Sequence, residues 1–208
     1  MDTYPNYRAL AAAETRGRDF FHAGRHRASP VLVIAPHGGR IESGTAEIAR
    51  AIAGRSFSWY TFLGLKGSGN RDLHLGSTHF DEPRCLKLLA DHQWVLAIHG
   101  CGDPGERVFL GGLDLELKEE LAQALRAAGL EALCKGHAYP GRDPRNICNR
   151  GARGCGVQLE LTRDLRHGPC LSGLIRATRE ILLSRAALCK AEAEENRRLR
   201  GLSRLNDI

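Results

Sequence analysis

Two short apolar runs constrain the fold of this chain more than any other feature of its sequence. Val31 to Ala35 runs into Pro36-His37-Gly38-Gly39, and Trp94 to Ile98 runs into His99-Gly100-Cys101-Gly102. Continuous apolar runs of this length, stopped by turn-forming residues, are typical of buried strands. Each strand is therefore predicted to end at a loop, which begins with Pro36-His37 after the first run and with His99 after the second.

The segments around these runs alternate between strands and helices, as in a layered α/β domain. Further strands are predicted at Phe57 to Phe62, Arg107 to Leu110 and Val157 to Thr162. Helices are predicted from Thr45 to about Ala53, from the capping sequence Asp81-Glu82-Pro83, from Asp114 to Ala128 with Gly129 closing it, and from Leu171 to about Leu199. We expect a single domain over residues 1–208, with a charged helical tail after about residue 190.

The composition is that of a protein that buries an ordinary apolar core. Apolar residues make up 42% of the chain and charged residues 26%, so the core needs no disulfide staples. The seven cysteines include no Cys-x-x-Cys pair, and we predict that they are reduced thiols, most of which pack against other side chains. No stretch approaches the roughly 20 apolar residues that cross a bilayer, and residues 1–16 lack a hydrophobic signal core. We expect a cytoplasmic protein, which cell lysis could release, with no membrane partner.

The net charge of +6 comes largely from arginine and leaves three interpretations open. A basic surface can attract nucleic acid, attract an acidic substrate, or be merely solvated. Aromatic residues make up only 6% of the chain, and no basic stripe is interleaved with stacking residues. A nucleic-acid-binding accessory protein is therefore the disfavoured alternative. The sequence leaves the oligomeric state open.

Two histidines and one glutamate are candidates for a metal site. Ligands of α/β sheets gather beyond the carboxyl ends of strands, where His37 and His99 are both predicted to lie. Glu42 follows His37 by five residues, which on one helix would set the side chains about 140° apart. His37 must therefore lie on the loop before the helix if both are to contact one metal. Two histidines, one carboxylate and one open position form the ligand set of a catalytic zinc ion.

Several longer motifs of the sequence resemble those of the poly-γ-glutamate hydrolase family of phages and bacteria. The resemblance spans Tyr4 to about Leu165. It rests on Pro36-His37-Gly38-Gly39-Arg40-Ile41-Glu42-Ser43-Gly44-Thr45, Ser77-Thr78-His79-Phe80-Asp81-Glu82-Pro83, Ile98-His99-Gly100 and Gly156-Val157-Gln158-Leu159-Glu160-Leu161. It implies a three-layer, zinc carboxypeptidase-like α/β fold with a mixed sheet between helices. It also implies one zinc ion per chain and hydrolysis of γ-linked glutamyl amides.

The resemblance also implies roles for individual residues. His37, Glu42 and His99 match the zinc ligands of the family, and Glu160 matches the glutamate that acts as base toward water. The alternation of Val157 to Thr162 places Glu160 on the polar face of its predicted strand, together with Gln158 and Thr162. Without the resemblance, an exposed strand carboxylate would explain Glu160 equally well.

The loop from Gly141 to Gly154 is the candidate for recognition of the substrate. Its guanidinium groups can bind carboxylates or stabilise an oxyanion, and Arg150 is the first choice for a catalytic role. A solvated basic loop or a phosphate-binding patch would fit almost as well. Cys101 beside His99 is a weaker alternative as a nucleophile. The remaining substrate-binding candidates are His74, Tyr139, Arg142, Arg145 and Asn149.

The resulting prediction is a zinc hydrolase of γ-glutamyl amide bonds in an acidic polymer or peptide, with poly-γ-glutamate as the named candidate. The net positive charge agrees with such a substrate. The alternative within enzymes is a zinc amidase or deacylase that acts on small N-acyl amino acids or on γ-D-glutamyl peptides of the cell wall.

Overall fold

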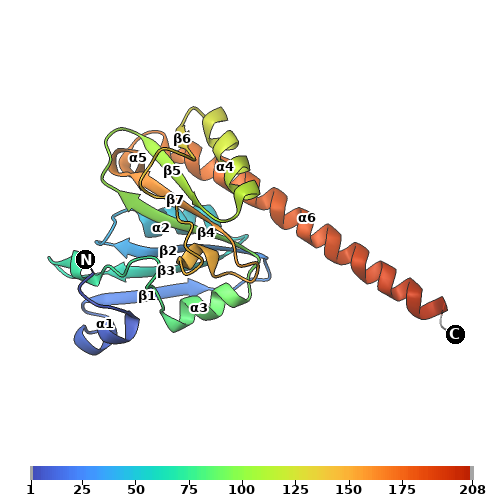
Figure 1. Ribbon diagram of the computed structural model, residues 1–208, viewed down its shortest axis with the longest axis horizontal. Helices are drawn as coiled ribbons and strands as arrows, with labels where there is room; N and C mark the ends of the chain where they lie inside the picture. Colours follow the sequence, from blue (N-terminus) through green and yellow to red (C-terminus); the bar gives the residue numbers. More distant parts are fainter. Residues whose placement is uncertain (1, 207–208) are drawn as a thin grey trace.

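The two apolar runs lie side by side in the middle of a mixed sheet (Figure 1). The structure is a computed structural model that describes residues 2–206. Within these residues the strand order is β1-β3-β2-β4-β7-β5-β6, with β1 antiparallel to β3, β5 antiparallel to β7, and the other neighbours parallel. The strands are β1 (Phe20–Arg25), β2 (Val31–Gly39), β3 (Ser58–Gly64), β4 (Trp94–Cys101), β5 (Arg107–Gly112), β6 (Glu131–Leu133) and β7 (Val157–Thr162).

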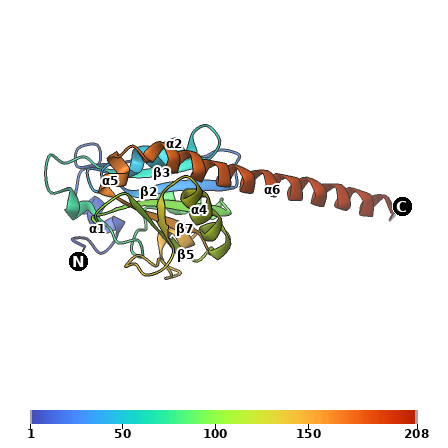
Figure 2. The same cartoon turned by 90° about the horizontal axis from the view of Figure 1, so that it is seen from above.

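Helices and loops cover both faces of this sheet (Figure 2). One face packs against α2 (Thr45–Ala53), α4 (Leu115–Ala127) and α6 (Leu171–Asn206). The other face packs against α1 (Tyr7–Ala13), α3 (Pro83–Ala90) and two short 3₁₀ segments, η1 (Asn70–Leu73) and η2 (Ile147–Asn149). A short helix, α5 (Arg163–His167), follows β7. The prediction of a three-layer α/β fold with a mixed sheet is confirmed.

The helices α3 and α4 begin at acidic capping residues, as the sequence indicated, whereas the N-cap of α2 is Gly44 and not Thr45, and no side chain caps it. The Glu82 side chain accepts from the Cys85 amide at the start of α3, and Asp114 accepts from the Leu117 amide at the start of α4. Gly129 follows α4 with φ of 84°, in the left-handed region that glycine adopts without steric cost. The last helix runs unbroken to Asn206 and projects beyond the sheet (Figure 1). The tail after residue 190 is therefore helical up to Asn206.

Both central strands extend further than the sequence predicted. β2 continues through His37 to Gly39, where a loop was expected, because its end still pairs with Leu63 and Gly64 of β3 after a register shift between Ala35 and Gly38. That close approach requires glycine, since a Cβ at Gly39 would lie 2.5 Å from the Gly64 carbonyl oxygen. β4 likewise continues through His99 to Cys101. The two histidines thus stand on strands, at a β-bulge in the case of His37.

Gly38 provides a test of this tight packing at the end of β2. A Cβ at position 38 would lie 2.7 Å from the Cβ of Ala46 and 2.9 Å from the carbonyl oxygen of Phe62. We expect Gly38→Ala to lower the free energy of unfolding by about 1–3 kcal/mol, because neither neighbour can move without shifting α2 or β3. Urea denaturation measures this loss. Gly67→Ala is the control, since a Cβ there meets no atom within 4 Å; equal losses in both variants would contradict this prediction.

The polar face of β7 is buried rather than solvated. β7 lies between β4 and β5, and only 4% of Gln158 and none of Thr162 is exposed. Thr162 binds the backbone of Arg107 through its hydroxyl, and Gln158 binds Asn146 at 2.8 Å. The interpretation of Glu160 as an exposed strand carboxylate is therefore wrong, because the loop before β7 covers that face of the sheet.

The cysteines and the helices bear on two further expectations from the sequence. All seven cysteines are free thiols, and Cys85 and Cys148 pack within the apolar core, as expected of packing thiols. Among the described residues, no helix combines the length and the apolar character needed to cross a membrane.

Candidate metal centre and active site

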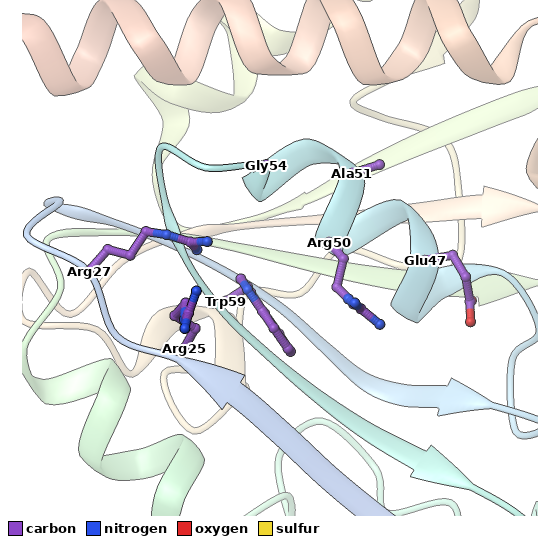
Figure 3. A pocket seen from close by; sticks show the side chains of 7 residues that line it. All are labelled: Arg25, Arg27, Glu47, Arg50, Ala51, Gly54 and Trp59. Atoms are coloured by element: carbon purple, nitrogen blue, oxygen red, sulfur yellow. The ribbon is translucent and has the colours of Figure 1, made fainter.

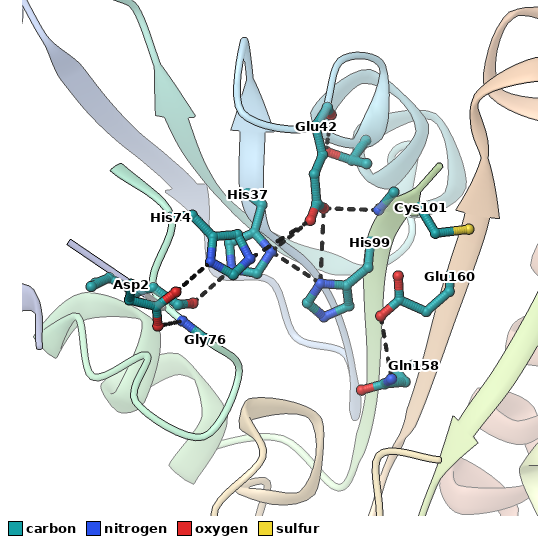
Figure 4. Close-up of polar contacts among 12 residues, drawn as sticks. Asp2, His37, Glu42, His74, Gly76, His99, Cys101, Gln158 and Glu160 are labelled. Atoms are coloured by element: carbon teal, nitrogen blue, oxygen red, sulfur yellow. Dashed lines mark hydrogen bonds and ion pairs between the residues drawn. The ribbon is translucent and has the colours of Figure 1, made fainter. Parts of the chain in front are cut away.

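His37, Glu42 and His99 converge at the carboxyl ends of β2 and β4 (Figure 4). His37 and His99 stand on these adjacent parallel strands, and Glu42 lies in the turn between β2 and α2. The Glu42 amide donates to the His37 carbonyl at 2.8 Å, which folds the turn back over the strand. His37 precedes the helix, as required, but it lies on strand β2 and not on a loop.

The donor atoms of the three residues face one another at short range. The Nδ1 atom of His37 lies 3.1 Å from Glu42 Oε1 and 3.2 Å from His99 Nδ1. The other oxygen of Glu42, Oε2, accepts from the Gly100 amide at 2.8 Å. Glu42 is thus held by the backbone of β4 on one side and presents its second oxygen to the histidines.

The second nitrogen of His37 fixes the tautomer of its ring. Nε2 lies 2.7 Å from the Leu75 carbonyl oxygen, which can only accept. Nε2 therefore donates to this carbonyl, which leaves Nδ1, the nitrogen that faces Glu42 and His99, as the atom that would bind a metal after losing its proton. A carbonyl that orients an imidazole from behind is the usual arrangement around a metal-binding histidine.

These distances fit the coordination geometry of zinc. Tetrahedral zinc, with bonds of about 2.0–2.1 Å, separates its ligand atoms by about 3.3 Å. The observed separations from His37 Nδ1 are 3.1 and 3.2 Å, and all three donor atoms lie within 4.8 Å of one another. Two imidazoles and a carboxylate leave one position open, as a catalytic metal requires. These residues therefore fit the ion that the sequence led us to expect.

Burial and mutual charge set the protonation of the three donors. Burial and the neighbouring His37 hold the pKa of His99 at about 3, so that its ring is neutral. Burial opposes charge on His37 as well, but the Glu42 carboxylate outweighs it and raises the pKa of His37. Burial would raise the pKa of Glu42, yet the two histidines and the Gly100 amide hold it at about 2. The cluster therefore offers an ionised carboxylate and at least one neutral imidazole.

Glu160 stands beside the metal cluster on the next strand. It is the register partner of His99 on β4, and side chains of paired parallel residues point to the same face. Figure 4 shows its carboxylate next to the His99 ring. Gln158 Nε2 contacts Glu160 Oε1 at 3.4 Å. Burial, reinforced by the charge of Glu42, raises the pKa of Glu160 to about 8. A carboxyl group with such a pKa can both take up and release a proton near neutral pH.

His74 is brought to the cluster from the chain segment after η1. Its ring centroid lies 4.0 Å from that of His37, and its Nε2 lies 4.0 Å from Glu42 Oε1. Its Nδ1 contacts Asp2 at 2.8 Å, and Asp2 also accepts from the Gly76 amide at 2.5 Å. Asp2 thus orients His74. No sequence pattern indicated this pair, because 72 residues separate its members.

Tyr139 also approaches the site. Its hydroxyl donates to Asp103 at 2.5 Å, and that hydrogen bond, with burial, raises the pKa of Tyr139. The Tyr139 carbonyl accepts from Gln158, the residue that also contacts Glu160. The Tyr139 hydroxyl is therefore neutral and bound to Asp103, while the Tyr139 backbone carbonyl contacts Gln158 on the strand that carries the candidate base.

The remaining substrate candidates lie on the loop before β7, outside the cluster. Arg150 is exposed and donates to the Phe80 carbonyl at 3.2 Å, and Arg145 pairs with Asp143. Arg142 lines a separate cavity. Asn149 is buried and is engaged by four backbone groups of its surroundings. Among the described residues, no hydrogen bond or ion pair joins any of these four side chains to the cluster.

A buried arginine that sequence reasoning missed lies behind the cluster. Only 7% of Arg166 is exposed, and its guanidinium donates to the carbonyls of Ser43 and Cys101. It packs so closely on Gly100 that a Cβ there would lie 2.6 Å from its Cζ. Burial lowers the pKa of Arg166. Its short, charged segment resembles a solvated helix in sequence, so only the tertiary structure reveals its position.

Cys101 is not a suitable nucleophile. Burial raises the pKa of its thiol to about 11, so that the thiolate is scarce near neutral pH. Nucleophilic cysteines need a lowered pKa. The environment of Cys101 therefore disfavours the alternative of cysteine catalysis beside His99.

Comparison with known proteins assigns the family. Residues 4–169 match the model of the family described as poly-gamma-glutamate hydrolase. The UPF0714 protein YndL of Bacillus subtilis (strain 168) is 39% identical over 167 residues. This match covers 79% of the present chain and 66% of YndL, so the chain spans slightly less than two thirds of that relative.

Solved structures agree with this assignment. A bacteriophage poly-gamma-glutamate hydrolase superposes with a TM-score of 0.86 at 32% identity, over 90% of this chain and 100% of that one. A zinc-free structure of YndL superposes with a TM-score of 0.82 at 33% identity, over 88% and 98%. An N-formylglutamate amidohydrolase from Ralstonia eutropha JMP134, at 12% identity and a TM-score of 0.52 over 84% and 99%, shares the fold alone. The chain belongs to the poly-gamma-glutamate hydrolase family.

Proposed function

We propose that this protein is a zinc-dependent hydrolase that cleaves γ-glutamyl amide bonds of poly-γ-glutamate. The observation that carries the proposal is the convergence of His37, Glu42 and His99, with Glu160 beside them, in a chain of this family. One solved structure of YndL is a zinc-free apo form, which supports zinc as the metal of that relative. The donor set and its spacing support zinc for this chain as well.

The proposed mechanism divides the work between the metal ligands and Glu160. Bound zinc would polarise the scissile carbonyl and lower the pKa of the attacking water. Glu160 accepts the proton of that water and delivers it to the leaving amine nitrogen. Its buried environment favours the protonated form that delivers the proton to the amine, and the positive charge of bound zinc would lower its pKa toward the ionised form that accepts the proton of water.

The substrate contacts are proposed from proximity to this centre. His74, oriented by Asp2, and Tyr139, linked through Gln158, are the candidates for contact with the scissile unit. For Arg142, Arg145, Asn149 and Arg150 a role toward the substrate stays a prediction from sequence. Glutamyl polymers carry many carboxylates, so arginines beyond the centre can bind them without touching the metal.

A combined metal and activity measurement tests the proposal. Purified protein should contain about one zinc per chain and should shorten poly-γ-glutamate, and a chelator should abolish the activity until zinc is restored. Small N-acyl amino acids and γ-D-glutamyl peptides are assayed in parallel. Full activity after removal of all metal would overturn the zinc proposal, and activity on these small compounds alone would overturn the polymer as substrate.

The affinity for zinc should fall as the solution becomes more acidic. Glu42, with a pKa of about 2, and His99, with a pKa of about 3, hold no proton between pH 5 and 6. The pKa of His37 is raised above 6.5, so in this range zinc must displace a proton from His37. We expect a loss of about tenfold in affinity per pH unit in this range. Competition titrations in a Glu160→Gln background, which removes the proton of Glu160, measure the slope. An affinity that does not vary over this range would contradict it.

A further inference from the structure

Three arginines surround a tryptophan at the opposite end of the sheet from the metal centre. Arg25, Arg27 and Arg50 line a cavity of about 500 Å³ together with Trp59 (Figure 3). The Arg50 guanidinium lies over the Trp59 ring, 5.2 Å from its centroid. Arg27 is fixed by a 2.6 Å hydrogen bond to the Phe57 carbonyl. We refer to Arg25, Arg27 and Arg50 as the arginine cluster.

The arginine cluster gathers three positive charges around one hollow. Among the described residues, none of the three forms an ion pair with a carboxylate. Glu47 lines the same cavity without an ion pair to the cluster. Guanidinium groups that line one hollow without a carboxylate partner can bind the carboxylates of a ligand, in a planar, bidentate manner.

The helix α2 extends from the turn beside the metal centre to the arginine cluster. Trp59 pairs with Arg25 of β1 and with Val33 near the start of β2, whereas His37 lies near the end of β2. The helix α2 runs back from the turn that holds Glu42 toward Gly54, which lines the cavity. A second cavity, of about 650 Å³, includes Ser43 and shares Glu47 with the first. Two cavities that share Glu47 therefore follow α2 from Ser43, the residue after Glu42, to the arginine cluster.

We propose that the arginine cluster is a second binding site, outside the metal centre, for the carboxylates of a poly-γ-glutamate chain. The inference rests on the proposed function for the identity of the polymer. Each unit of a γ-linked polymer keeps a free α-carboxylate, so one chain offers a row of anions to several guanidinium groups. A polymer long enough to occupy both sites gains affinity through the effective concentration of its bound segment, and a short oligomer does not. Glu47, on the path between them, opposes this binding by charge repulsion.

Matched charge variants test the arginine cluster. Arg25→Gln/Arg50→Gln should raise the KM for long poly-γ-glutamate by about tenfold and leave the KM for a short γ-glutamyl oligomer unchanged. Arg8→Gln/Arg16→Gln, at two exposed positions on the N-terminal segment, removes the same charge elsewhere and should change neither value. Glu47→Gln should lower the KM for the polymer. An equal effect in the two double variants would show that net charge alone attracts the polymer, and would overturn the second site.

A binding measurement separates this inference from the proposed function. In a Glu160→Gln background, retention of polymer on immobilised protein should weaken with salt and should weaken about tenfold in Arg25→Gln/Arg50→Gln. If wild-type protein hydrolyses the polymer, but neither the KM nor the retention of polymer changes in Arg25→Gln/Arg50→Gln, the second site is overturned and the proposed function stands. If wild-type protein hydrolyses neither substrate while polymer binding still depends on the cluster, the proposed function fails and the second site stands. Duplex DNA that binds the cluster more tightly than the polymer would overturn the inference.

Discussion

Glu160→Gln should lower kcat by about 10²–10⁴-fold and leave zinc bound, because general-base action is typically worth that much. Glutamine keeps the shape of the side chain and can still bind a water molecule, but it cannot accept the proton. The fold should tolerate the change. In the metal-free protein the pKa of Glu160 is about 8, so its surroundings already hold a neutral side chain at neutral pH.

Single-turnover hydrolysis and metal content, measured on the same sample, test this expectation. Glu119→Gln, at an exposed position of α4, is the matched control and should behave like the wild type. A Glu160→Gln protein that keeps both its zinc and a near-normal rate would show that the base lies elsewhere. Loss of zinc together with activity would instead assign Glu160 a role in holding the metal.

His99→Ala should reduce the affinity for zinc by more than about 100-fold and abolish hydrolysis at ordinary zinc concentrations. Loss of a residue that merely supports a ligand typically costs about 10–100-fold, and His99 is proposed to supply a direct bond. Its Nδ1 lies 3.2 Å from that of His37, and only 2% of the residue is exposed, so alanine at this position would remove a buried donor atom from the cluster.

The matched control for this variant is another buried histidine on the same side of the sheet. His92 is fully buried and precedes β4 in the chain. Its Nδ1 contacts the Leu88 carbonyl and not the metal cluster. His92→Ala should cost stability and leave the affinity for zinc unchanged. Thermal unfolding separates the two effects. Unaltered zinc binding in His99→Ala, in a protein that remains folded, would rule His99 out as a ligand.

Local pattern in the sequence was sufficient for most of the central sheet. The apolar runs at residues 31–35 and 94–98 are long enough and apolar enough to require burial on both sides, and β7 was predicted from its alternation with its observed bounds. Short-range sterics and capping also placed the starts of α3 and α4. Because His37 and His99 follow such runs, their position at the carboxyl-end edge of the sheet could be expected from the sequence, but the pairing of β2 with β4 could not, since β3 lies between them in the chain.

The sequence by itself therefore determined the fold class, the candidate metal ligands and the candidate base, since these follow from periodicity, strand ends and family motifs. Only the tertiary structure decided three features: the β-bulge at His37, the contact of Asp2 with His74, and the burial of Arg166 against Gly100. It also decided which arginines gather in a cavity and which remain on a solvated loop. The physical reason is that these features depend on the approach of segments far apart in the chain, and no local pattern of residues encodes the distance between them.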